Sequence, residues 1–589
     1  TRYADTSRAN IPTDTLLVWP VEYSYNFNAD GTVRDSVPRS PDGMLTKELH
    51  FYYGTPFEKI INWELGRYIT PYGIGLSLGE GWTWVYDVTD FAPLLKDSVH
   101  LTAGNFQELL DMKFVFIEGT PPRDVVELRN VWQGDFSLKN FTRDVAPKTF
   151  TLHPDAKSFK LRTTVTGHQF SNATNCAEFC PKIHSVLVDG QVKWNWQIIQ
   201  ECSMNPLYPQ GGTWIYARAG WCPGMEGMIK EFELTPYVTG STVNIDYESQ
   251  YDEFGNYVME SQLVSYTAPN HRLDAAIERI VTPSDDKLQG RFNPSCGRPR
   301  IVLRNRGADV LSSVDIRYGV RGGESRSYTW RGSLGFMEQA DVWLPPLGDM
   351  GGTGANVFEV SLSNPNGGSD EYSYNDKQWS GFENVPVYDQ PLIVIFRTNN
   401  APGENSYEIL DAEGTSIYSR SGFIANATYR DTLRLLPGCY EFLLHDSGED
   451  GISWWANNDG AGSLQFRLLQ GELWKTMQPD FGKQSRYPFR YSSLVSTEAV
   501  ALPGMDFSCY PNPATERLSL RFGPHAGASL RYVLVDLLGR EVLHGTVDNT
   551  AGEAGTLMLD VSALQPGMYV AHLVQGARIL ASDRVTIVK

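Results

Sequence analysis

Two short segments bring together residue types that can perform acid–base chemistry. The segment 175–180 places Glu178 between two cysteines, and the segment 214–225 carries Arg218 among aromatic side chains. A carboxylate can activate water as a general base, and an arginine can hold a developing oxyanion through paired N–H donors. His168 lies just upstream of the first segment.

The same residues also have an ordinary structural explanation. Trp214 and Trp221 offer flat faces for sugar rings, but tryptophans are most often core residues. Arg218 would then be a surface or paired charge, and Glu178 a solvated loop residue. Composition alone favours this structural explanation.

The cysteines allow two interpretations. Four of the seven lie between residues 175 and 223, where they could bind zinc or form two local disulfides. We favour disulfides in a secreted protein, because His168 and His184 do not complete a tight ligand set. A bridge between Cys176 and Cys180 would close a very small loop, so its main effect would be to fix the direction of Glu178.

The three remaining cysteines lie far apart in the sequence. They imply at least one unpaired thiol or a bridge across domains. These residues are Cys296, Cys439 and Cys509.

The composition excludes several classes of protein. The net charge of −19 argues against binding to nucleic acids or anionic membranes. A hydrophobic content of 41% is enough for buried cores. No apolar run approaches the length of a membrane span. Because Thr1 is neither an initiator Met nor part of a signal peptide, we expect a mature or truncated product.

The elements around these residues are predicted to be strands. Abundant Gly, Pro, Tyr, Trp, Val and Thr favour short strands joined by turns. The segments 185–188 and 191–194 should form a hairpin closed by Asp189-Gly190. Helical periodicity is limited to two short candidates, 106–110 and 272–279. The chain is therefore predicted to be all-β and built of sandwiches.

A set of unusual strings resembles the bacterial peptide:N-glycosidase F family, whose members remove N-linked glycans from asparagine. The resemblance extends from about residue 1 to residue 269. The strings are Glu64-Leu-Gly-Arg-Tyr-Ile-Thr-Pro-Tyr72, Asp87-Val-Thr-Asp-Phe91, Leu161-Arg-Thr-Thr164, Gly167-His168, Cys176-Ala-Glu-Phe-Cys180 and Arg218-Ala-Gly-Trp-Cys-Pro-Gly-Met225.

The resemblance implies two adjacent jelly-roll-like β-sandwiches with a site at their interface. It implies the pairings Cys176–Cys180 and Cys202–Cys222. Glu178 would help to hold a water and the sugar, and Arg218 would bind the glycan core or the asparagine amide. His168, Trp221 and Trp214 would line the cleft. The implied reaction is hydrolysis of the amide between asparagine and N-acetylglucosamine, with no cofactor for catalysis.

One departure from the family pattern falls at the start of the chain. The family's Trp-Asp-Arg-Tyr string is matched only at its end. Arg2 is therefore retained and is predicted to be catalytic, while the catalytic Asp would fall on Thr1 or upstream. Asp5 is the nearest carboxylate. A third family carboxylate would fall near Ala103, with Glu108 close by at a different spacing.

Two further features are functional candidates. The long insertion 12–58 is either a lid over the cleft or a surface ornament. The segment 443–451 places three carboxylates close together beside a glycine turn, those of Asp446, Glu449 and Asp450. This pattern predicts either a structural calcium site or a simple acidic turn.

The last eighty or so residues, from Cys509-Tyr-Pro-Asn-Pro513 to Val585-Thr-Ile-Val-Lys589, resemble the type A sorting domain of the type IX secretion system of Bacteroidetes. The resemblance implies export across the outer membrane, followed by release or attachment at the cell surface.

The sequence therefore predicts a secreted amidase acting on N-glycosylated proteins or glycopeptides and exported by type IX machinery. The alternative is a catalytically inactive glycoprotein-binding protein of the same family. The predicted domains are a first jelly-roll over 1–150 with its N-terminal strand truncated, a second over 151–283, an adhesion-type sandwich over 284–384, an accessory sandwich over 385–495 and the sorting domain over 506–589.

Overall fold

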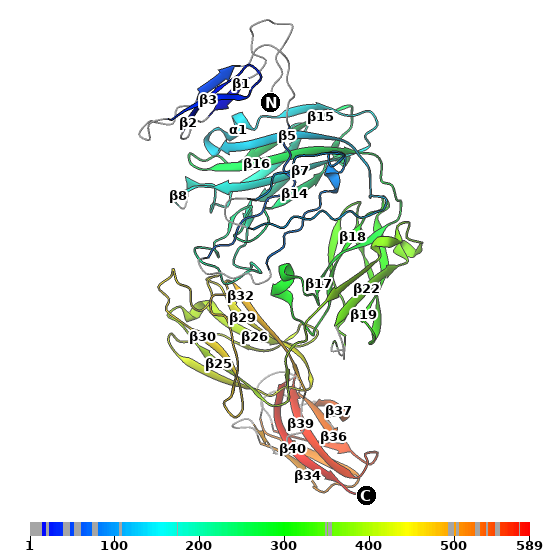
Figure 1. The fold of residues 1–589 in the computed structure, drawn as a ribbon. Coiled ribbons are helices and arrows are strands. Elements are labelled where there is room, and N and C mark those ends of the chain that lie inside the picture. Colours follow the sequence, from blue (N-terminus) through cyan, green and yellow to red (C-terminus); the bar gives the residue numbers. More distant parts are fainter. Residues whose placement is uncertain are drawn as a thin grey trace. The chain divides into compact units, whose positions relative to one another are not determined.

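The structure of the chain is a computed structural model. It describes residues 15–18, 23–38, 48–51, 61–73, 81–104, 109–172, 175–347, 350, 356–492, 500–501, 506–524, 530–536, 540–547, 554–576 and 578–589. The chain divides into two compact units, Thr1–Leu65 and Gly66–Lys589. The described residues are almost entirely strand and loop (Figure 1), which confirms the predicted all-β class.

The first unit contains two antiparallel strand pairs within the predicted insertion 12–58. In one pair β1 joins β4, and in the other β2 joins β3. Their bounds are β1 Thr15–Val18, β2 Tyr23–Phe27, β3 Val33–Pro38 and β4 Glu48–Phe51. Whether this segment acts as a lid stays a prediction.

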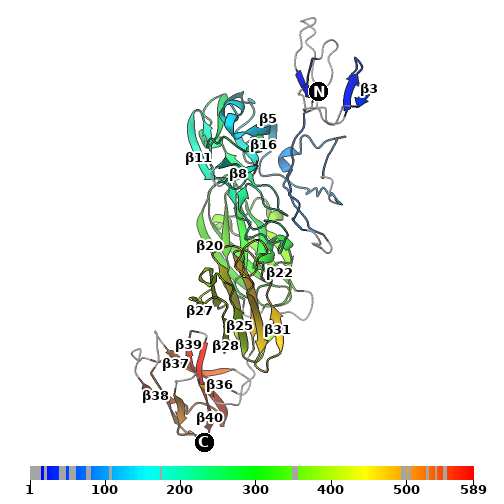
Figure 2. The ribbon, with the colours of Figure 1, turned by 90° about the vertical axis from the view of Figure 1, so that its left-hand side faces the viewer.

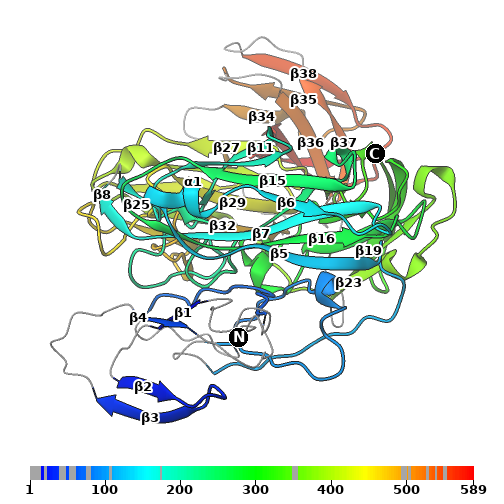
Figure 3. The same ribbon diagram turned by 90° about the horizontal axis from the view of Figure 1, so that it is seen from above.

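Two four-stranded antiparallel sheets form a sandwich over residues 125–266, and their strands lie in two layers (Figure 3). One sheet contains β6 Lys148–Thr151, β10 Ile183–Val188, β11 Gln191–Gln197 and β15 Thr242–Ser249, and the other β5 Val125–Ser137, β7 Ser158–His168, β14 Ile229–Glu233 and β16 Asn256–Tyr266. Their order is β11-β10-β15-β6 and β14-β7-β16-β5. The predicted second jelly-roll thus takes β5 and β6 from the range assigned to the first.

The hairpin of β10 and β11 forms as predicted. Asp189 and Gly190 both have positive φ, at 49° and 75°, which matches the right-handed twist of the two strands. The sandwich core lies between the sheets and includes Trp132, Val186 and Tyr247.

The outer face of the sheet containing β7 is polar and nevertheless buried. Described residues from 66–73 and 81–91 contact it, and Arg67 donates to the hydroxyl of Thr166 on β7. Lys160 forms an ion pair with Asp90 at 2.6 Å, and the guanidinium of Arg162 lies over the ring of Phe91 at 5.3 Å. Within the described residues 61–124 there is only a 3₁₀ turn and one isolated bridge, so a separate first jelly-roll is not found in the part of the chain that the structure describes.

Two sheets form the next sandwich, over residues 275–381. Its strands are β17 Ala275–Thr282, β18 Arg300–Asn305 and β21 Gln339–Trp343 in one sheet, and β19 Leu311–Val320, β20 Ser325–Leu334, β22 Val357–Ser363 and β23 Lys377–Gly381 in the other. The predicted helix 272–279 is wrong, because β17 occupies most of it. Its apolar run 275–277 is buried on both sides, and such short runs do not distinguish a helix from a strand. The other candidate, 106–110, lies largely outside the described residues.

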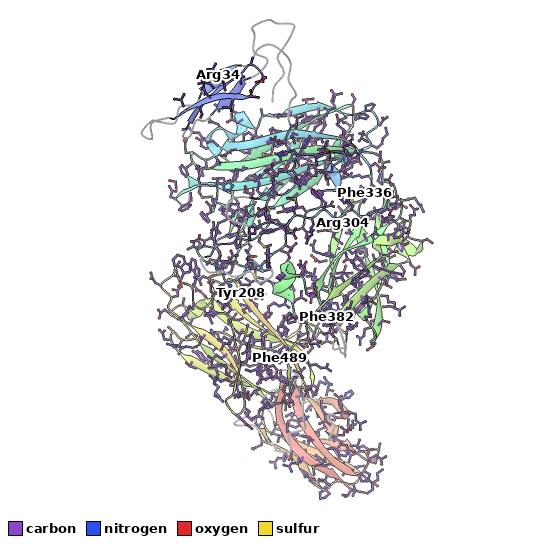
Figure 4. The ribbon with its side chains drawn as sticks, viewed as in Figure 1. Arg34, Tyr208, Arg304, Phe336, Phe382 and Phe489 are labelled. Carbon is purple, nitrogen blue, oxygen red and sulfur yellow. A yellow bond between two sulfur atoms is a disulfide. The ribbon has the colours of Figure 1, made fainter. Side chains whose placement is uncertain are left out.

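The sandwich over residues 387–491 has a five-stranded and a four-stranded sheet. The first contains β24 Val387–Tyr388, β26 Asn405–Leu410, β27 Ser416–Arg420, β29 Gly438–Asp446 and β32 Gln484–Tyr491, and the second β25 Leu392–Arg397, β28 Thr428–Leu433, β30 Ser463–Leu468 and β31 Leu473–Thr476. Its core is rich in aromatic rings, and Phe489, labelled in Figure 4, is fully buried in it.

The C-terminal sandwich covers residues 500–587 (Figure 2). Its strands are β33 Val500–Ala501, β36 Leu530–Asp536, β37 Glu541–Val547, β39 Gly567–Gln575 and β40 Arg578–Ile587 in one sheet, and β34 Phe507–Tyr510, β35 Arg517–Phe522 and β38 Gly555–Asp560 in the other.

The remaining elements are short. They are β8 Phe170–Asn172, β9 Asn175–Cys176, β12 Ile199–Gln200, β13 Arg218–Ala219, α1 Phe141–Asp144, η1 Thr89–Phe91, η2 Leu138–Asn140, η3 Thr235–Tyr237, η4 Lys287–Phe292, η5 Pro365–Gly367, η6 Ser373–Asn375 and η7 Pro402–Glu404. None of the helices in the described residues is long and apolar enough to cross a membrane.

Three disulfides join the cysteines. The pairings Cys176–Cys180 and Cys202–Cys222 are confirmed. The third, Cys296–Cys439, links the 275–381 and 387–491 sandwiches, and Cys509 is a buried free thiol. Both options left open for the last three cysteines therefore occur.

Replacing Cys296 and Cys439 together by Ala should lower the free energy of unfolding by about 2–4 kcal/mol. The bridge spans a sequence separation of 143, so it removes much conformational freedom from the unfolded chain. Chemical denaturation of the purified chain measures the loss. Cys509→Ala is the control, since it removes a buried thiol that closes no loop. A double variant no less stable than this control would contradict the prediction.

Candidate functional site

Glu178 and Arg218 meet in the 125–266 sandwich although they lie forty residues apart. The Nε of Arg218 donates to Oε1 of Glu178 at 3.2 Å. The side chain of Arg218 is 1% exposed and that of Glu178 is 19% exposed. Burial raises the pKa of Glu178, and the charge of Arg218 opposes this rise. The pair is thus a largely desolvated carboxylate held by a buried cation.

Backbone contacts fix the loop that carries Glu178. The N–H groups of Ala177 and Glu178 donate to the carbonyl of Gln169 at 3.2 and 3.3 Å, and the N–H of Ala219 donates to the carbonyl of Glu178 at 2.7 Å. A second anchor is Asp252, whose Oδ2 accepts from the N–H of Cys176 at 3.3 Å. The disulfide closes a loop that is already hydrogen-bonded on both sides.

Replacing Cys176 and Cys180 together by Ala should reduce activity more than stability. Their separation of four residues gives little loop entropy, whereas the bridge limits the directions open to Glu178. Glycan release and thermal unfolding of the same preparation provide the comparison. The pair Cys202–Cys222, with a separation of twenty, is the contrasting control. Equal fractional losses of activity and stability would overturn this assignment.

The other donors of Arg218 are used inside the protein. Its Nη1 donates to the carbonyl of Tyr216 at 2.7 Å, and its Nη2 donates to the carbonyl and hydroxyl of Thr213 at 2.9 and 3.0 Å. The guanidinium also lies 4.9 Å from the rings of Phe179 and Trp221. In this arrangement Arg218 orients Glu178 and orders the loop 213–216, rather than presenting a free pair of donors to a ligand.

Sterics explain why glycine occupies the third position of the string Arg218-Ala-Gly-Trp. Gly220 has φ +74°, and a Cβ there would lie 2.1 Å from the carbonyl oxygen of Val165. Only glycine therefore lets this strand approach β7 closely enough to bring Arg218 to Glu178.

His168 and Trp221 pack together beside this pair. Their rings are stacked with centroids 5.9 Å apart, and the indole N–H of Trp221 donates to the carbonyl of Gly167 at 2.8 Å. Burial and the charge of Arg67 lower the pKa of His168. Arg67 donates to the hydroxyl of Thr166, which lies 2.8 Å from Nε2 of His168. Substrate contacts of His168 and Trp221 stay predictions.

The predicted substrate-binding role of Trp214 is corrected. Its side chain is completely buried, and its indole N–H donates to the carboxylate of Asp480 in the 387–491 sandwich at 3.2 Å. It packs with Ile215 and Trp454. Trp214 is thus a core residue that joins two sandwiches.

Arg2, Thr1, Asp5 and Glu108 lie outside the described residues, and the catalytic assignment of Arg2 stays a prediction. Ala103 is exposed and lies outside the helices and strands. Tyr72 was not singled out, although it ends a string that carried the family resemblance. Its ring centre lies 5.5 Å from the guanidinium of Arg218.

The three carboxylates that were predicted to bind calcium do not all lie together in the structure. Asp446 and Asp450 group with Glu404, with one oxygen from each within 4.8 Å of the others. Glu449 instead forms an ion pair with Lys483 at 3.1 Å. The Oδ1 of Asp450 is buried without a hydrogen-bond partner, which suits a cation ligand. Asp446 also accepts the N–H groups of Asp450 and Gly451, so the acidic-turn interpretation stays open.

Calcium is expected to raise the melting temperature of the chain, and Asp446→Asn should remove this response. Burial raises the pKa of Asp446 to about 7, so the cation competes with a proton and its effect should grow as the pH rises through 7. Differential scanning calorimetry with calcium and with chelator makes the measurement. Glu449→Gln is the matched control. Identical melting temperatures of the original protein with calcium and with chelator would contradict the prediction.

Comparison with known proteins gives two family matches. Residues 138–264 match the family described as "Peptide-N-glycosidase F, C terminal", and residues 508–587 match "Secretion system C-terminal sorting domain". Both predicted resemblances are confirmed over these residues. The sorting domain confirms that the protein is secreted or attached at the cell surface.

Among curated proteins, the peptide-N(4)-(N-acetyl-beta-D-glucosaminyl)asparagine amidase F of Elizabethkingia miricola is 30% identical over 208 residues. The match covers 32% of this chain and 58% of that relative, so the chain spans little more than half of its length. The solved structure of PNGase F, a glycosylasparaginase from Flavobacterium meningosepticum, is 25% identical with a TM-score of 0.22, covering 26% of this chain and 55% of that one.

Proposed function

We propose that the protein is an exported amidase that hydrolyses the bond between the asparagine side chain and N-acetylglucosamine of N-glycosylated proteins or glycopeptides. The observation that carries the proposal is the ion pair between the buried Arg218 and Glu178, which lies in the loop closed by the Cys176–Cys180 disulfide. The match of the surrounding residues 138–264 to the peptide-N-glycosidase F family supports it. Transport by the type IX secretion machinery belongs to the same proposal.

In the proposed reaction, the carboxylate of Glu178 orients a water molecule and accepts its proton. The water oxygen bonds to the side-chain carbonyl carbon, the carbon–nitrogen bond breaks, and the proton passes to the departing nitrogen. The products are aspartate and a glycosylamine. The role of Arg218 is to hold Glu178 ionised and aimed, and no metal takes part.

The test is incubation with a denatured glycopeptide in water enriched in the heavy oxygen isotope. Conversion of asparagine to aspartate, with that isotope in the new carboxyl group, is the expected result. Glycan release without label in the peptide would indicate cleavage of a different bond. Glycan binding without any conversion would overturn the amidase and support the alternative, a glycoprotein-binding protein of the same family.

A further inference from the structure

A loop of the 387–491 sandwich reaches the candidate site of the 125–266 sandwich. The loop joins β29 to β30 (Figure 1) and carries the adjacent residues Trp454 and Trp455. Trp454 is 6% exposed and belongs to a small apolar cluster with Trp214 and Ile215, against which Tyr72 also packs. The loop is therefore a packed neighbour of the residues around Arg218.

Trp455 is held at one edge while much of its surface remains accessible. Its indole N–H donates to the carbonyl of Gly212 at 3.0 Å, yet the residue is 68% exposed. At the base of the loop, Asp446 accepts the N–H groups of Asp450 and Gly451, both at 2.9 Å. A large exposed aromatic side chain fixed in this way loses little conformational freedom when a ligand packs on it.

A continuous series of aromatic rings connects Trp455 to the charged pair. Phe179, which follows Glu178 in the chain, contacts Tyr216 with ring centroids 6.2 Å apart. Tyr216 contacts Trp454 at 5.5 Å, and Trp454 contacts Trp455 at 6.0 Å. Tyr216 is 46% exposed. The two exposed rings thus lie on one path that leads outward from Glu178.

We propose that Tyr216 and Trp455 form an outer sugar-binding subsite of the proposed amidase, so that the 387–491 sandwich takes part in recognising the glycan. The inference rests on the proposed function. An exposed aromatic ring packs against the apolar C–H face of a pyranose, and the exposed Asn458 nearby in the loop offers a carboxamide to sugar hydroxyls. Because the path starts at Glu178, the occupant is a sugar remote from the cleaved bond.

The test measures binding of two free sugars to the full chain and its variants by calorimetry. The probes are an oligomannose-type N-glycan and N,N′-diacetylchitobiose. Trp455→Ala should weaken binding of the oligomannose glycan about tenfold and leave chitobiose binding unchanged. Trp455→Phe keeps an aromatic ring but lacks the N–H donor to Gly212, so it should weaken oligomannose binding less than Trp455→Ala does. Trp379→Ala removes a tryptophan of matched exposure, 67%, from the 275–381 sandwich and should change neither.

Equal oligomannose affinity of Trp455→Ala and the original protein would overturn the inference, as would the absence of oligomannose binding to the original protein. Unchanged melting temperatures exclude misfolding as the cause of a loss. The amidase is judged separately, by conversion of asparagine. If oligomannose binding depends on Trp455 but no asparagine is converted, the proposed amidase is contradicted and the subsite is supported. If asparagine is converted but binding does not depend on Trp455, the amidase is supported and the subsite is contradicted.

Discussion

Replacing Glu178 by Gln should lower the rate of asparagine conversion by about 10²- to 10⁴-fold, the range typical of a lost general base. Gln keeps the size of the side chain and can still accept from Arg218, so the loop should keep its shape. Steady-state kinetics on a denatured glycopeptide measure the loss. Glu248→Gln, an exposed glutamate on β15 of the same sandwich, is the matched control. A Glu178→Gln variant with the activity of this control would remove Glu178 from the mechanism.

The variant Arg218→Met tests whether Arg218 positions Glu178 for catalysis or only stabilises the fold. The charge of Arg218 lowers the pKa of Glu178 against the effect of burial, so its removal should raise that pKa further. The activity that needs an ionised carboxylate should then appear only at higher pH. A shifted pH–rate profile supports the positioning role. A uniform loss of activity at all pH values would mean that Arg218 serves the fold alone.

Replacing Arg291 by Met should destabilise the packing between sandwiches by roughly 3 kcal/mol or more, since each buried acceptor left unpaired costs about 1–3 kcal/mol. Arg291 lies in η4 and is 7% exposed. Its guanidinium donates to the carbonyls of Asn205 and Ser203 on one side and of Phe481 and Gln484 on the other.

The ring of Tyr208, labelled in Figure 4, lies 3.7 Å from the Arg291 guanidinium and packs against the core of the 387–491 sandwich. A methionine would keep part of this contact but none of the hydrogen bonds. Thermal unfolding of the full chain should show a first transition at a lower temperature. Arg397→Met, at an exposed position on β25, is the control. An unchanged temperature of the first unfolding transition would show that water replaces these hydrogen bonds without loss of stability.

Local patterns in the sequence were sufficient for several features. The turn at Asp189-Gly190 was predictable because positive φ favours glycine and the flanking strands alternate. The loop around Glu178 and the string after Arg218 were recognisable because their residue types are rare in that spacing. The secretion tail was identified in the same way. Each of these signals comes from residues that are close in the chain.

The features that local patterns missed depend on residues far apart in the chain. Trp214 looked like a cleft residue, but Asp480, 266 positions away, gives its indole N–H a partly buried partner. Glu449 was predicted as a calcium ligand, but it is Glu404 that groups with Asp446 and Asp450 once β26 and β29 pair. Trp455 comes to the candidate site only because two sandwiches pack together. Burial and long-range hydrogen bonding set these roles, and neither is encoded in the spacing of neighbouring residues.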